Sequence, residues 1–99
     1  MKTATYYKID GYVTTVVPKN GKHFTYDELR LFVGERVEIV PMPSGDLMVV
    51  HEEGKLIGLP ENRNATEVWK SEYPIEKYAG NNDELVVGDA LVSPAKFIR

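Results

Sequence analysis

The chain has 99 residues, of which 42% are hydrophobic and 27% charged, with a formal net charge of −3 at pH 7. This length fits one domain with a modest core, and the absence of cysteine excludes disulfides, zinc–thiolate sites, iron–sulfur clusters and thiol nucleophiles. The first residues lack the apolar stretch of a signal peptide, and no later run has the length of a membrane span. We therefore expect one cytoplasmic domain over residues 1–99, with an ordered core over about 6–93 and no membrane contact.

The N-terminal third predicts a strand followed by a helix. Residues 6–17 are rich in β-branched and aromatic side chains and include Gly11, which predicts a strand with a bulge at that glycine. Thr25 and Glu28 have the spacing of a capping box, in which each side chain bonds the main-chain N–H of the other residue. Apolar side chains then follow at helical spacing, so we expect a helix that ends at Gly34.

The middle of the chain predicts two antiparallel strands. Residues 36–40 alternate polar and apolar, a Pro-Ser-Gly-Asp turn follows, and residues 47–50 are a continuous apolar run. The second strand is expected to lie centrally in the sheet, because both of its faces are apolar. Residues 56–60 predict a short strand or extended segment, with Leu56 and Leu59 in the core.

The C-terminal third predicts a second helix and a last strand. Asn62 is suited to cap a helix that runs through Trp69 and ends before Pro74. Residues 84–92 form two apolar pieces around a Gly-Asp pair, which favours a strand bent at Gly88.

The predicted element order is β-α-β-β-α-β. It indicates an α+β domain with a small mixed or antiparallel sheet of about four strands and two helices. The ferredoxin-like split βαβ sandwich, with both helices on one face, is the first topology that fits. An irregular α+β fold with residues 56–58 in the sheet is the alternative.

No reaction-class motif is present, so we assign no catalytic residue, no metal and no cofactor, and an enzyme is the less favoured interpretation. His51 and Glu53 lie two residues apart at a strand end but have no third ligand in sequence, whereas catalytic zinc needs three. The negative net charge disfavours nucleic acid and leaves single-strand binding only as a weak alternative.

Aromatic residues supply the first candidate surface. Tyr6, Tyr7 and Trp69 are candidates for contact with a protein partner, because Tyr and Trp are enriched at interfaces. Packing in the core is the competing interpretation of the same three residues. The exposed strand edges of so small a sheet are also compatible with a homodimer.

The segment 58–66 supplies the second candidate site. If it lines a cleft, Asn62 and Thr66, about one helical turn apart, offer polar groups to a small ligand, with Glu53 as a third contact. The competing interpretation is structural, with Asn62 acting only as a helix cap.

Two blocks of sequence resemble a known family. They read Glu-Glu-Gly-Lys-Leu-x-Gly-Leu-Pro-x-Asn-x-x-Ala-Thr over residues 52–66 and Val-Gly-Asp-Ala-Leu-Val over residues 87–92. Over about residues 7–92 the chain resembles a domain-of-unknown-function family of small proteins from bacteriophages, prophages, plasmids and conjugative elements of gut bacteria. His51 stands where the family pattern leads us to expect Asn. The resemblance implies a mobile-element origin and a cytoplasmic host setting, and it supplies no activity, cofactor or catalytic residue.

We therefore expect a small accessory protein of a mobile genetic element that acts as a non-enzymatic protein-interaction module. A small ligand-binding protein or enzyme that uses residues 58–66 is the alternative.

Overall fold

The computed structural model describes residues 2–72 and 85–98, which form five strands, two α-helices and a short 3-10 helix. The elements are β1 (Ala4–Tyr7), β2 (Val13–Val16), α1 (Tyr26–Val33), β3 (Val37–Pro41), β4 (Leu47–His51), α2 (Arg63–Ser71), β5 (Ala90–Ser93) and η1 (Ala95–Phe97). The predicted strand over 84–92 is therefore shorter and begins at Ala90. Glu84 and Pro74, which bounded two predictions, lie outside the described residues.

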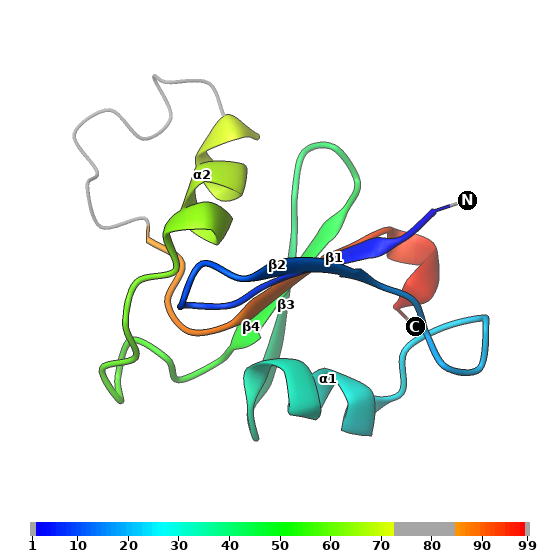
Figure 1. Ribbon diagram of the computed structural model, residues 1–99, viewed down its shortest axis with the longest axis horizontal. Coiled ribbons are helices and arrows are strands. Elements are labelled where there is room, and N and C mark those ends of the chain that lie inside the picture. Colours follow the sequence, from blue (N-terminus) through cyan, green and yellow to red (C-terminus); the bar gives the residue numbers. More distant parts are fainter. Residues whose placement is uncertain (1, 73–84, 99) are drawn as a thin grey trace.

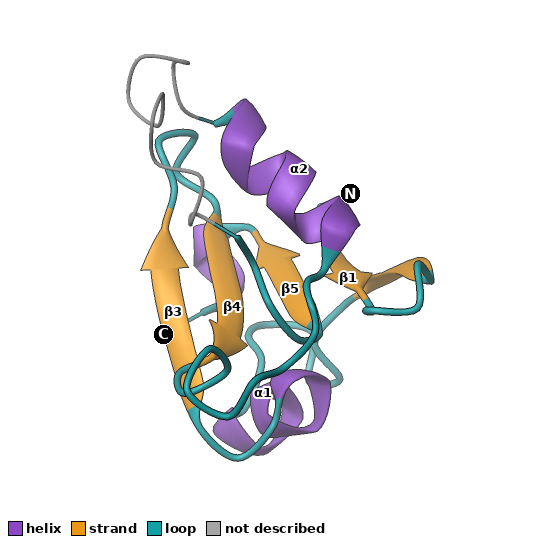
Figure 2. Ribbon diagram, turned by 90° about the vertical axis from the view of Figure 1, so that its left-hand side faces the viewer, coloured by secondary structure: helices purple, strands orange, loops and turns teal. Residues whose placement is uncertain are grey.

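The strands form one sheet in the order β2-β1-β5-β4-β3, and every neighbouring pair is antiparallel. Figure 2 shows β3, β4, β5 and β1 in succession across it. The α+β class is confirmed. The ferredoxin-like topology is wrong. In a split βαβ unit the two strands joined by a helix run parallel, with another strand between them, whereas here α2 lies between β4 and β5 in the chain, and these two strands are adjacent and antiparallel. The alternative that put residues 56–58 in the sheet is also wrong, since these residues form turns.

The single strand predicted over residues 6–17 is a hairpin of β1 and β2. Lys8 N donates to Tyr12 O at 2.9 Å, and the Asp10 carboxylate accepts a bond from Tyr12 N at 2.9 Å. Gly11 has φ +95°, a conformation that Asp-Gly pairs supply in tight hairpin turns. The bulge expected at Gly11 is therefore wrong: the chain reverses direction there and forms a hairpin turn.

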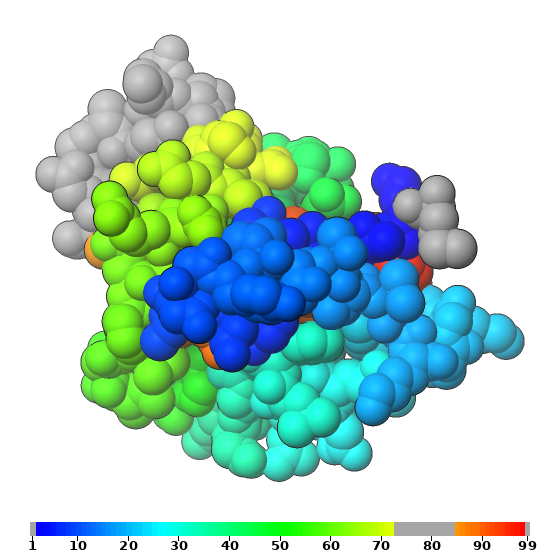
Figure 3. Space-filling view, viewed as in Figure 1, coloured from blue at the N-terminus to red at the C-terminus, as the bar shows by residue number. Residues whose placement is uncertain are grey.

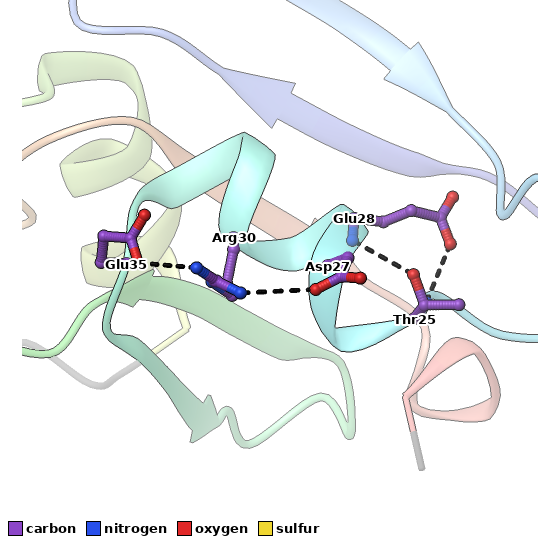
Figure 4. A network of polar contacts seen from close by, with 5 residues as sticks. All are labelled: Thr25, Asp27, Glu28, Arg30 and Glu35. Carbon is purple, nitrogen blue, oxygen red and sulfur yellow. Dashed lines mark hydrogen bonds and ion pairs between the residues drawn. The ribbon is translucent and has the colours of Figure 1, made fainter.

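The capping box of α1 is confirmed (Figure 4). The Thr25 hydroxyl accepts from Glu28 N at 3.1 Å, and Thr25 N donates to the Glu28 carboxylate at 2.8 Å. This main-chain bond lowers the pKa of Glu28 below its usual value. On the exposed side of the helix, Arg30 bridges Asp27 at 3.4 Å and Glu35 at 2.6 Å. Both carboxylates are exposed, so these ion pairs add little to stability.

The two α-helices cover opposite faces of the sheet, with α2 above it and α1 below it in Figure 1. Successive side chains of a strand point to opposite faces, and the adjacent residues Met48 and Val49 of β4 are both buried. The α1-side cluster contains Ala4, Phe24, Leu29, Val33, Val49, Leu91 and Phe97. The α2-side cluster contains Met42, Met48, Ala65, Val86 and Ala90. The expectation of both helices on one face is therefore wrong, and the core extends beyond the predicted range of 6–93.

Candidate functional site

The α2 face of the sheet carries a groove next to Trp69. Ala65 of α2 is fully buried against the sheet with Met48 and Ala90, whereas Trp69, further along the helix, is only half-buried. The groove has a volume of about 300 Å³. We call it the Trp69 groove, lined by Glu38, Val40, Met48, residues 50–52, Lys55, Leu56, Trp69 and residues 85–87.

One wall of the Trp69 groove is the loop of residues 52–58. Main-chain bonds fold this loop into successive turns, from Ile57 N to Glu53 O at 3.0 Å and from Leu59 N to Gly54 O at 2.9 Å. These turns leave Leu56 84% exposed, which corrects the expectation that Leu56 packs in the core. Leu59 is half-buried, and its side chain lies against Gly54.

The polar groups that line the groove carry charge of both signs. Glu38 from β3 and Glu52 from the loop are exposed carboxylates, and Lys55 supplies one ammonium group. The apolar side chains come from β3, β4, α2, the loop and the segment of residues 85–87 before β5. The groove can therefore receive an apolar group, with hydrogen-bond acceptors and negative charge at its border.

Asn62 and Thr66, two of the predicted ligand contacts, are buried and bonded within the chain. Asn62 is 0% exposed; its Nδ2 donates to Tyr7 O at 2.8 Å and to Gly88 O at 2.9 Å, and its Oδ1 accepts from Ala65 N at 3.1 Å. The Thr66 hydroxyl accepts from Val86 N at 2.9 Å. These contacts favour the structural interpretation, since the Asn62 amide has no surface to offer a ligand.

Glu53, the third predicted contact, bonds different residues from those that Asn62 and Thr66 bond. Its carboxylate pairs with Arg36 Nε at 3.3 Å, and its main-chain N donates to His51 Nδ1 at 3.0 Å. Glu53, Asn62 and Thr66 do not line the Trp69 groove, so the structure does not bring the three predicted residues together around it.

The three aromatic candidates lie on different faces of the sheet. Tyr6 packs with the α1-side cluster, whereas Tyr7 and Trp69 pack with the α2-side cluster. The Tyr6 hydroxyl donates to Phe32 O at 2.8 Å and lies 3.3 Å from Asp89 Oδ2; burial and this carboxylate raise the pKa of Tyr6 to about 12. Burial also raises the pKa of Tyr7. Of the three, only Trp69 lines the groove.

Among residues 2–72 and 85–98, no three His, Asp or Glu side chains are grouped closely enough to hold a metal ion. Within the same ranges, no helix combines the length and apolar character needed to cross a bilayer. In comparisons with known proteins, no family model, curated protein or solved structure matches this chain. The resemblance to a mobile-element family stays a prediction.

Sequence reasoning missed most of the Trp69 groove. Val40 and Val50 read as ordinary strand residues, and the groove beside them depends on where α2 packs on their face of the sheet. A usable signal was the apolar pair Leu56-Ile57 inside a glycine-bounded turn. In the structure both side chains are exposed, and Ile57 is 59% exposed. Exposed apolar side chains beside a groove are typical of interaction sites.

Proposed function

We propose that this chain is a non-enzymatic protein-interaction module that holds an apolar side chain of a partner protein in the Trp69 groove. The observation that carries this proposal is the groove itself, in which Trp69 and the exposed Leu56 flank an apolar floor of strand residues. Trp is one of the residues enriched at energetically dominant interface positions. The accessory role in a mobile element belongs to the same proposal and rests on the family resemblance.

The charges at the groove narrow the chemistry of the partner. Glu38 and Glu52 favour a basic residue next to the apolar anchor, since opposite charges at an interface border raise the association rate and the specificity. The volume of about 300 Å³ lies at the lower limit of small-molecule sites. The proposed ligand is therefore a segment with one large apolar side chain beside Lys or Arg.

The test selects peptides from a random library on the immobilised full chain and measures their affinities. Trp69 is the only tryptophan, so its fluorescence reports occupancy of the groove directly. We expect the selected peptides to pair a large apolar residue with a basic one. Leu56→Asp should weaken their binding at least about tenfold, because it places a charge at the apolar wall.

Leu31→Asp is the matched control. Leu31 is 82% exposed, close to the 84% of Leu56, but lies on α1 at the opposite face of the sheet. Its substitution should leave peptide affinity unchanged. Selected peptides that lack apolar residues, or that bind wild type and Leu56→Asp equally well, would contradict the proposal.

A further inference from the structure

The two edge strands of the sheet, β2 and β3, differ in how they are protected against pairing with another strand. In antiparallel pairs, residues alternate between those that bond the neighbouring strand and those whose N–H and C=O point away from it. Free outward groups at an edge form a template for a further strand. Which residues point outward follows from the bonds that the structure shows at each edge.

The β3 edge is protected. Glu52 N donates to Arg36 O at 2.8 Å and Met42 N donates to Asp46 O at 3.0 Å, so the even-numbered residues of this strand face β4 and Pro41 points its backbone outward. Proline has no N–H to donate there. The exposed carboxylate of Glu38 adds a charge to the same strand. Both features are known to discourage pairing at an edge.

The β2 edge has neither form of protection. Lys8 N donates to Tyr12 O within the β1–β2 register, so Thr14 faces β1 while Val13 and Thr15 point their main-chain groups away from the sheet. Residues 11–18 include no charged side chain, and their only proline is the last of them. Figure 3 shows the β1–β2 hairpin, in blue, at the front of the molecule with no other segment over it.

The side chains of this edge are also uncovered and apolar. Val13 is 46% exposed and Val17 is 50% exposed, on either side of the exposed Thr15. The arrangement is self-complementary, because antiparallel pairing centred on Thr15 places Val13 of one copy opposite Val17 of the other. β-branched pairs of this kind stabilise neighbouring strands.

The charges that flank β2 also favour a second copy of this chain as the partner. Asp10 precedes the uncharged stretch and Lys19 follows it, and both are exposed. Antiparallel pairing brings the start of one strand beside the end of the other, so Asp10 of one copy lies at the same end of the seam as Lys19 of the second copy. A second copy therefore meets opposite charges although each chain carries a net charge of −3.

We propose that two copies of this chain pair through their β2 strands, antiparallel and centred on Thr15, so that the sheet continues across a two-fold axis. The interface is isologous, as in most homodimers. Because β2 has only four residues, the dimer belongs to the weak class that buries less than about 1,200 Å². It uses the opposite end of the sheet from the Trp69 groove and does not rest on the proposed function.

Sedimentation equilibrium of the full chain between about 10 µM and 1 mM tests the dimer. We expect the mass to rise from that of the 11.2 kDa monomer towards that of a dimer. Thr15→Pro should abolish the rise and leave the monomer folded, since the Thr15 N–H does not bond β1. Ile39→Lys on the β3 edge, where Ile39 is 40% exposed, should associate like wild type.

A second pair of variants, with opposite charges at position 15, tests the dimer if Thr15→Pro fails to fold. Thr15→Lys and Thr15→Glu each place like charges directly opposite at the two-fold axis and should weaken dimerisation about fivefold at low salt. Their equimolar mixture should dimerise at least as well as wild type. Wild type that stays monomeric at about 1 mM, variants that dimerise unchanged, or a mixture that does not associate would each overturn the proposal.

Discussion

Replacing Asn62 by alanine tests whether this side chain is a structural tie or a ligand contact. The Asn62 amide joins three parts of the fold: it caps α2 through Ala65 N and donates to carbonyl oxygens of Tyr7 in β1 and Gly88 before β5. Alanine removes all three bonds at a site with no exposed surface.

The expected loss follows from the three bonds. An N-cap of this kind contributes about 1 kcal/mol, and each of the other two hydrogen bonds contributes about 1 kcal/mol. Asn62→Ala should therefore lower the free energy of unfolding by about 3 kcal/mol, out of a total of roughly 5–15 kcal/mol for a domain of this size. Asn62→Ser keeps a capping oxygen and should lose about 1 kcal/mol less.

Urea unfolding followed by Trp69 fluorescence measures the change. The midpoint should fall while the slope m stays constant, because the surface exposed on unfolding is nearly the same. Asn64→Ala is the matched control: Asn64 lies in the same helix but is exposed, and its loss should stay within about 0.5 kcal/mol. If Asn62→Ala costs less than about 1 kcal/mol, the structural reasoning fails and a ligand role for Asn62 regains support.

Three further predictions concern local features of the fold. Thr25→Ala removes the α1 cap and should lower urea stability by about 1 kcal/mol; no change would mean that water replaces the cap. Tyr6→Phe removes the bond to Phe32 O and should cost about 1 kcal/mol. Because the pKa of Tyr6 is raised from 10.0 to about 12, the unfolded state loses its proton first, so wild type should lose stability as pH rises through this interval, and Tyr6→Phe should lose less. Gly34→Ala should lower thermal stability by roughly 1–3 kcal/mol, because φ is +117° and a Cβ would lie 2.7 Å from an imidazole carbon. Gly45→Ala, where nothing lies within 4 Å, should cost less.

Local signals in the sequence were sufficient for both helices. The Thr25–Glu28 box and the Asn62 cap act within a few residues of their own position, and both are confirmed. Asp10-Gly11 is an equally local turn signal, but the dense β-branched residues on both sides of it favoured one long strand. The choice between a bulge and a reversal depends on whether the second half finds a partner, which is a tertiary property.

The placement of the helices on opposite faces of the sheet could have been inferred from the sequence. The apolar run of residues 47–50 indicated a strand with two apolar faces, and burying both faces requires cover on both sides of the sheet. Placing both helices on one face leaves one of Met48 and Val49 without cover, yet both are buried. The position of β5 has a similar explanation, because Ala90 and Leu91 are also consecutive and fully buried. The Trp69 groove depends on all of these placements together, so no single stretch of sequence could reveal it.

The central position of β5 has a consequence for how the chain acquires its structure. Thr5 pairs with Val92, so the β1–β2 hairpin and the β3–β4 hairpin are joined in one sheet only through the strand that comes last in sequence. During synthesis the inner strand of each hairpin therefore lacks a hydrogen-bonding partner until β5 has been made. Contacts of such long sequence separation slow folding. A chain truncated before Ala90 should fail to assemble the sheet, and it should be degraded by proteases or aggregate.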